Sequence, residues 1–230
     1  MPHAKSDKTK VKTSRAVVNR TKAAGCPEVE GVTITEYAMR SGLQTVSSGL
    51  WRWLQGTGLE RFEVARAADY WIFRGTILTL ASDAAAEARY EIVCDRSFRT
   101  RQANVSVCDA AGERTLQIAT ENGQWYENGR ENKTVVGALD IDLGWSPSTN
   151  TLPIKRLKLG IGRTSGEFMA AWLRFPDLTL QPLPQEYVRL ADRQYRYSSR
   201  SGAFVANLLV DDDDLVVDYE GFWQRVRDNK

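Results

Sequence analysis

Short runs in which apolar and polar residues alternate recur from about residue 49 almost to the C-terminus. In one run, Ala103, Val105 and Val107 alternate with Asn104 and Ser106. Because successive side chains of a β-strand point to opposite faces, each run predicts a strand with one buried face. Further strand-like runs lie at residues 71–80, 90–95, 116–118, 157–161, 168–175, 195–197, 204–210 and 215–219.

Turn residues separate these runs at intervals of roughly ten positions, which is typical of antiparallel all-β folds. Asn122-Gly123 is the strongest turn signal and predicts a hairpin. The four Asp residues at 211–214 predict a solvated hairpin tip, and the glycines of 160–166 predict a β-turn. Helix signals are weak and confined to residues 28–43 and 220–227. The sequence therefore predicts a mainly β sandwich or barrel with little helix.

The charge of the chain is unevenly distributed. Residues 1–25 carry seven Lys and Arg residues and a single Asp, whereas the net charge of the whole chain is +2. We therefore expect residues 1–48 to form a basic, largely disordered extension and residues 49–228 to form the β domain. The extension is either a solvated tail, an organelle-targeting segment, or a patch for nucleic acid or anionic lipid. We expect a cytoplasmic protein without an integral membrane segment or a nucleic-acid partner, and targeting by the tail stays open. The oligomeric state also stays open.

The chain contains one histidine, His3, in the basic extension. The predicted domain therefore excludes a Ser-His-Asp triad, a Cys-His dyad and a histidine-based zinc site. Its cysteines are not at zinc spacing, and three cysteines fit a reducing compartment better than a disulfide framework. These observations favour a binding protein over an enzyme, and we expect neither a metal nor another cofactor.

Two carboxylates, Asp140 and Asp142, lie two residues apart in a strand-like stretch, so we expect them on one face. They could pair with Arg101, Lys155 or Arg156, contact a polar ligand, or act as acid and base. The seven Trp and eight Tyr residues could mostly fill the core. Such residues also suit the mouth of an amphiphile site, because each combines an apolar face with a polar group.

Residues 137–143 and 146–157 are the most distinctive part of the sequence, and they resemble the signature of the "putative glycolipid-binding" family, first described as a domain of unknown function. Other segments agree in order along residues 49–227. They include Gly123-Gln-Trp125, Phe175-Pro176-Asp-Leu178 and Asp218-Tyr219-x-Gly221.

The resemblance implies a single curved antiparallel sheet that forms an incomplete barrel around an apolar cavity, similar to bacterial carriers of lipoproteins. It implies non-enzymatic binding or carriage of an amphiphile, such as a glycolipid. The alternatives are an enzyme that modifies a lipid or small molecule with Asp95, Asp140 or Asp142, and a scaffold whose aromatic surface meets another protein.

We expect Thr149 and Asn150 on a turn that leads into the next strand, because the residue before Pro153 disfavours helix. Asp142, Asn150 and Arg156 would then form one polar network at the barrel mouth, which either binds a headgroup or only braces the fold. The candidate ligand-binding residues are Tyr90, Asp95, Arg101, Trp125, Asp140, Asp142, Thr149, Asn150, Arg156, Gln185 and Tyr187.

Overall fold

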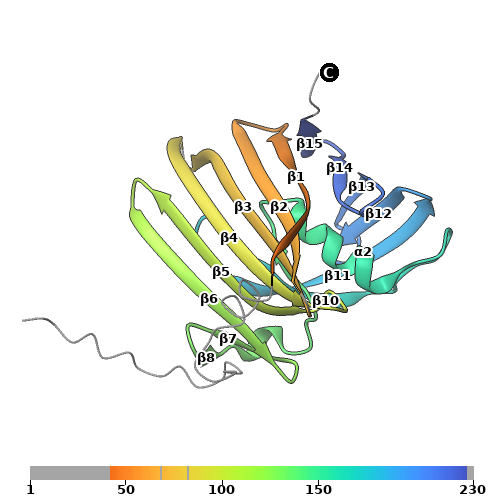
Figure 1. Ribbon diagram of the computed structural model, residues 1–230, viewed down its shortest axis with the longest axis horizontal. Coiled ribbons are helices and arrows are strands. Elements are labelled where there is room, and N and C mark those ends of the chain that lie inside the picture. Colours follow the sequence, from red (N-terminus) through yellow and green to blue (C-terminus); the bar gives the residue numbers. More distant parts are fainter. Residues whose placement is uncertain (1–41, 68, 82, 227–230) are drawn as a thin grey trace, which may run out of the picture.

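The computed structural model describes residues 42–67, 69–81 and 83–226, and within these ranges fifteen strands form one sheet (Figure 1). The strand order is β8-β7-β6-β5-β4-β3-β2-β1-β15-β14-β13-β12-β11-β10-β9. Neighbouring strands are antiparallel except β9 and β10, which are parallel. The strands are β1 (Gln44–Trp53), β2 (Gly58–Ala67), β3 (Tyr70–Ala81), β4 (Ala84–Asp95), β5 (Thr100–Asp109), β6 (Gly112–Glu121), β7 (Gln124–Glu127), β8 (Arg130–Glu131), β9 (Ile141–Leu143), β10 (Phe168–Leu173), β11 (Leu180–Ala191), β12 (Gln194–Ser199), β13 (Phe204–Val210), β14 (Val216–Tyr219) and β15 (Trp223–Val226).

The alternation in the sequence forms the strands as expected. In β5, Ala103, Val105 and Val107 are buried, and the residues between them are partly exposed. Asn122 and Gly123 join β6 to β7 with φ angles of 52° and 79°, which is the left-handed conformation that a two-residue hairpin turn requires. These findings confirm a mainly β protein built on one curved sheet.

The first and last strands of the described sheet are neighbours. β1 pairs with β15 in antiparallel register, with Trp51 opposite Arg225. The indole Nε1 of Trp51 also donates a hydrogen bond to the backbone oxygen of Val216, at 2.7 Å. The sheet is therefore continuous through β1 and β15, and its free edges are β8 and β9, which makes it an unclosed barrel.

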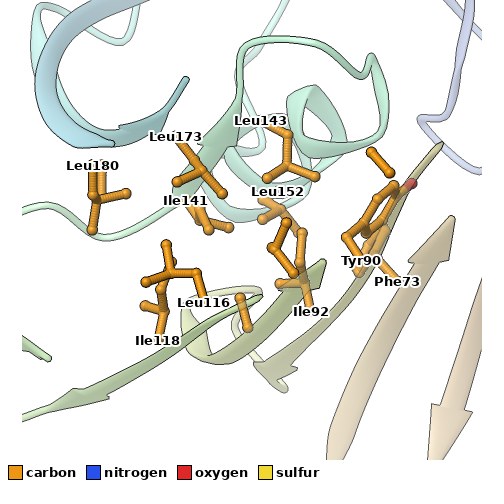
Figure 2. Close-up of a cluster of buried hydrophobic side chains, with 14 of the residues drawn as sticks. Phe73, Tyr90, Ile92, Leu116, Ile118, Ile141, Leu143, Leu152, Leu173 and Leu180 are labelled. Atoms are coloured by element: carbon orange, nitrogen blue, oxygen red, sulfur yellow. The ribbon is translucent and has the colours of Figure 1, made fainter. Parts of the chain in front are cut away.

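The end of the sheet formed by β9 and β10 packs on the concave face of the N-terminal strands. Ile141 and Leu143 of β9, with Leu173 of β10, point toward Ile92 of β4 and Ile118 of β6 (Figure 2). These side chains are buried and belong to one large hydrophobic cluster. The interior beneath β3–β6 is therefore packed with side chains.

The prediction of a turn after Asn150 and a strand over residues 157–161 is wrong. A 3-10 helix η2 (Ser148–Asn150) runs directly into helix α2 (Thr151–Leu157). Pro153 is compatible with this helix because it lies in the first turn, where backbone N–H groups have no partner within the helix. Lys158 ends the helix in a left-handed conformation with φ 47°.

The helix predicted over residues 220–227 is also wrong, because residues 223–226 form β15. Pairing with β1 and burial of Trp223 outweigh the weak local helix signal. β1 begins at Gln44, ahead of the expected domain start. The basic tail and most of the helix predicted over 28–43 lie outside the described residues. Another 3-10 helix, η1 (Lys133–Val135), precedes β9. In the part of the chain that the structure describes, no helix is long and apolar enough to cross a bilayer.

Candidate functional site

A cavity of about 190 Å³ lies between the C-terminal strands, the end of β1 and the segment that joins β9 to η2. We call it the polar cavity, because several hydrogen-bonding side chains enter it. Its polar lining residues are Asp142, Ser146, Asn150, Tyr197, Ser199, Arg200 and Tyr219. The remaining wall is apolar and mostly aromatic, and consists of Trp53, Leu143, Gly144, Trp172, Leu183, Phe204, Phe222 and Trp223.

A second cavity of about 360 Å³ adjoins the first, and we call it the apolar cavity. Trp53, Gly144, Trp172 and Trp223 line both cavities and therefore form the wall between them. The other lining residues of the apolar cavity are Ile77, Thr79, Leu80, Trp145, Arg174 and Phe175. A polar compartment and an apolar one thus share a wall made largely of tryptophan.

The shared wall depends on a glycine. A Cβ atom at Gly144 would lie 2.1 Å from Nε1 of Trp172 and 3.0 Å from Cε2 of the same ring. Real side-chain atoms do not approach so closely, so Gly144 allows the Trp172 ring to lie directly against the backbone. The position of this ring, and with it the division between the cavities, follows from the absence of a side chain at residue 144.

Asp142 enters the polar cavity from β9, where it lies opposite Trp172 of β10 in the parallel register. Its Oδ2 accepts a hydrogen bond from Nε2 of Gln185 on β11. Burial raises the pKa of Asp142 to about 6, although the Gln185 hydrogen bond partly opposes this rise. Burial, together with the nearby Asp142 charge, also raises the pKa of Tyr197 and Tyr219. The cavity therefore holds one carboxylate beside two neutral phenols.

Asn150 lines the same cavity from the end of η2. Its Nδ2 donates a hydrogen bond of 2.8 Å to the hydroxyl oxygen of Tyr187, which is buried on β11. Burial is also the main cause of the raised pKa of Tyr187. Asp142 and Asn150 thus share the cavity as predicted, and Gln185 and Tyr187 support them from β11.

Arg156 does not join them, so the predicted network of Asp142, Asn150 and Arg156 is wrong. Arg156, on α2, forms a bidentate ion pair with Asp140, and its Nε lies 3.1 Å from Oδ1. The guanidinium also lies over the ring of Phe168, 5.2 Å from its centre. Burial raises the pKa of Asp140 despite this pairing. The ion pair fastens α2 to the residue that precedes β9.

Other candidate residues serve the fold at separate places. Thr149 accepts a hydrogen bond from the backbone N–H of Leu143 through Oγ1, at 3.1 Å. Trp125 donates from Nε1 to the backbone oxygen of Ala138, at 3.0 Å. Neither side chain lines the polar or the apolar cavity.

Asp95 and Arg101 form an ion pair of 2.8 Å beside the turn between β4 and β5. Oδ1 of Asp95 accepts hydrogen bonds from the backbone N–H groups of Ser97 and Arg99 in this turn. The pair lines neither of the two cavities, so the structure does not bring it to Asp142.

Tyr90 contacts Glu60, a buried acid that was not predicted from the sequence. Its hydroxyl donates a hydrogen bond of 2.6 Å to Oε1 of Glu60, which also accepts one of 2.8 Å from Ser146. Glu60 is 0% exposed, its Oε2 has no hydrogen-bond partner, and burial raises its pKa to about 8. Alternation in β2 could have revealed it, because Glu60 shares a face with the buried residues Phe62 and Val64.

The sequence reasoning also did not place the aromatic residues that enclose the polar cavity. The rings of Trp53 and Trp223 lie 5.0 Å apart, and those of Phe204 and Phe222 lie 5.3 Å apart. These residues come from β1, β13, β15 and the turn that precedes β15, so only the strand order brings them together. In the described part of the chain, no three His, Cys, Asp or Glu side chains gather in a way that could hold a metal ion.

These features define a class of protein in which one rolled, unclosed sheet encloses a polar and an apolar cavity side by side. The family model described as "Putative glycolipid-binding" matches residues 49–225, and the chain belongs to this family. The resemblance inferred from the sequence is thereby confirmed, and it supports a binding role in general.

A solved structure gives the same assignment. The crystal structure of a DUF1089 family protein from Pseudomonas aeruginosa is 32% identical in sequence, with a TM-score of 0.68. The similarity covers 79% of this chain and 98% of that chain. No protein with a curated description matches the sequence.

Proposed function

We propose that the protein binds a glycolipid, with the sugar in the polar cavity and the hydrocarbon chain in the apolar cavity. The observation that carries this proposal is the shared wall of Trp53, Gly144, Trp172 and Trp223. It lies between a cavity with seven polar lining residues and one in which Thr79 and Arg174 are the polar lining residues. An amphiphile has the same two-part chemistry, so both parts of one molecule find a suitable surface. Family membership is consistent with this assignment.

The polar cavity offers the groups that sugar hydroxyls use. Asp142 has acceptor positions beyond the one that Gln185 occupies, and Ser199 can both donate and accept. The ring of Trp53 presents an apolar surface on which the C–H face of a sugar ring can rest. The headgroup would therefore be bound by hydrogen bonds at one end and by ring contacts at the wall.

The apolar cavity supplies the larger part of the binding free energy. Burial of hydrocarbon is worth about 0.8 kcal/mol per methylene group, so a chain segment of a few carbons outweighs a single hydrogen bond. Ile77, Leu80 and Phe175 line this space. A sugar without a chain should accordingly bind far more weakly than an alkyl glycoside.

We propose binding without catalysis. A general acid and base need two groups that act on one bond, and the carboxylates expected for such work are separated. Asp140 is paired with Arg156, and Asp95 is paired with Arg101. Asp142 alone enters the polar cavity, since no other carboxylate lines it in the part of the chain that the structure describes.

Calorimetry with dodecyl β-glucoside below its critical micelle concentration tests this function. We expect one site per chain, much weaker binding of free glucose, and no release of glucose or dodecanol on incubation. Thr79→Trp would fill the apolar cavity and should weaken binding by about tenfold or more, because several methylene groups lose their place. Leu78→Trp on the opposite, exposed face of β3 is the matched control and should bind normally.

Asp142→Asn tests the headgroup end. This variant should bind dodecyl glucoside several fold more weakly, because a neutral amide accepts hydrogen bonds less strongly than a carboxylate. If the glycoside does not bind, or if Thr79→Trp binds as the unchanged protein does, the two cavities are not the lipid site. Hydrolysis of the glycoside that Asp142→Asn abolishes would instead establish the enzyme alternative.

A further inference from the structure

Two arginines lie against the ring of Trp172, which separates the two cavities. The guanidinium carbon of Arg200 is 5.1 Å from the ring centre, and that of Arg174 is 5.6 Å from it. Arg200 lines the polar cavity and Arg174 lines the apolar one. Both positive charges therefore lie at the boundary where a bound glycolipid would pass from sugar to chain.

Neither charge has a carboxylate partner within the described ranges. Among the described residues, no ion pair involves Arg174 or Arg200. Arg101 and Arg156, the two arginines among the candidate ligand-binding residues, are paired with Asp95 and Asp140. The boundary between the cavities thus has two available cations, whereas the earlier candidates are engaged in the fold.

We propose that the ligand carries a phosphate between its sugar and its hydrocarbon chain, and that Arg174 and Arg200 bind this phosphate. The inference rests on the proposed function, because it assumes that the sugar and the chain occupy the two cavities. The order of surfaces then matches the order of groups: Asp142 for sugar hydroxyls, the two arginines for the phosphate, and the apolar cavity for the chain.

The chemistry of the arginines suits this role. A guanidinium presents several N–H donors in a fixed plane that fits the oxygens of a phosphate. Contact with the Trp172 ring restricts both side chains, so less conformational freedom is lost when they bind an anion. Asp142 would repel a phosphate within the polar cavity itself, which also favours the boundary over the interior for the anionic group.

A matched pair of amphiphiles tests the inference. The neutral probe is dodecyl β-glucoside, and the anionic probe is the phosphodiester of glucose 1-phosphate with dodecanol. For the unchanged protein, we expect the phosphodiester to bind about tenfold tighter or more, with an advantage that shrinks as salt increases. Equal affinity for the two probes would overturn the phosphate assignment and leave the proposed glycolipid function intact.

The variants Arg174→Gln and Arg200→Gln locate the effect. Both residues are exposed, so the fold should survive, and circular dichroism checks this. Each variant should weaken binding of the phosphodiester about tenfold more than it weakens binding of the glucoside. Arg196→Gln is the matched control, because Arg196 is an exposed arginine on β12 that lines neither cavity. An equal loss for both probes in the arginine variants would overturn the inference.

Two further probes distinguish a lipid phosphate from a free one. Glucose 1-phosphate and inorganic phosphate should each bind much more weakly than the phosphodiester, because they lack the chain. If inorganic phosphate binds as tightly as the amphiphile, the arginines form a site for the free anion and the lipid assignment is wrong. If neither amphiphile binds, the proposed function fails, and this inference fails with it.

Discussion

Glu60 is a buried carboxylic acid, and ionisation at this place would be energetically unfavourable. Its hydrogen-bond partners, Tyr90 and Ser146, are neutral, and the side chain is fully buried. An ionised group in such surroundings loses its hydration without gaining a cation, so the protonated form is favoured. Since Ser146 lines the polar cavity, Glu60 belongs to the layer directly behind the candidate site.

Protonation of Glu60 should make stability depend on pH. Its pKa is about 8 in the folded state, against an ordinary value of 4.5, so the folded chain holds an extra proton between these pH values. The free energy of unfolding should therefore fall as pH rises through this window, by at most about 1.4 kcal/mol per pH unit. Urea unfolding from pH 5 to 8.5 measures this slope, and Glu60→Gln should flatten it.

The exposed Glu113 on β6 gives the matched control. In Glu113→Gln, the free energy of unfolding should fall with pH as steeply as it does in the unchanged protein. A Glu60→Gln variant with the same slope as the unchanged protein would mean that Glu60 is already ionised in the fold at neutral pH.

The hydrogen bond between Asn150 and Tyr187 joins η2 to β11 inside the protein. Asn150→Ala should lower the free energy of unfolding by about 1–3 kcal/mol, because the buried Tyr187 hydroxyl loses its partner. Tyr187→Phe removes the other partner. The double variant should lose less free energy of unfolding than the sum of the losses in the two single variants. Urea unfolding of all three variants checks this, and additive losses would show that the two side chains are not coupled.

At the scale of elements, the sequence predicted the strands well and the inner segment poorly. Alternation such as that of Ala103, Val105 and Val107 is a local signal, and so is the Asn122-Gly123 turn. Residues 148–157 have no such period, because Leu152 packs against the N-terminal half of the sheet and Ile154 against the C-terminal half. A segment whose apolar residues face two different clusters shows no single period, so alternation does not reveal which structure it forms.

The candidate site was predictable only in part, for the same reason. Asp142 and Asn150 are close in sequence, and the resemblance indicated both. The partner of Arg156 depends on how α2 lies over β9, and the wall of Trp53 and Trp172 depends on strand order. Neither arrangement leaves a local pattern in the sequence.

Gly144 tests how the connection after β9 shapes the cavities. Gly144→Ala should displace the Trp172 ring, because the new Cβ would lie 2.1 Å from its Nε1. We expect weaker binding of dodecyl glucoside by tenfold or so, measured by calorimetry. Gly160→Ala is the matched control, since its Cβ would meet only Arg163 at an ordinary 3.6 Å. Unchanged binding by Gly144→Ala would show that the Trp172 position does not matter for the ligand.

At the scale of the whole molecule, one sheet provides both halves of the protein and both cavities. β1 and β15 join the two halves (Figure 1). Ile141 and Leu143 of β9 and Leu173 of β10 pack into the core of the N-terminal half. Trp51 strengthens this junction by its hydrogen bond to Val216 of β14, and its ring stacks on Phe62 of β2 at 3.7 Å. The ligand site therefore depends on contacts between distant parts of the chain.

Trp51→Phe tests the junction. It keeps an aromatic ring next to Phe62 but removes the N–H donor, so the free energy of unfolding should fall by about 1–3 kcal/mol in urea. Trp71→Phe is the comparison, because the Trp71 ring stacks on Phe98 at 4.9 Å and its indole donates no hydrogen bond to any residue that the structure describes. A smaller loss for Trp51→Phe than for Trp71→Phe would show that the indole hydrogen bond does not hold the two halves together.

The pairing of β1 with β15 also has a consequence for protein synthesis. Trp51 of β1 and its register partner Arg225 of β15 are far apart in the sequence, whereas the other strand pairs join neighbours along the chain. On the ribosome, hairpins such as β3–β4 can form as soon as they emerge, but one edge of β1 has no partner until residues 223–226 have been made. An unpaired strand edge is a site for aggregation, so the nascent chain is exposed to misassociation until its last strand arrives.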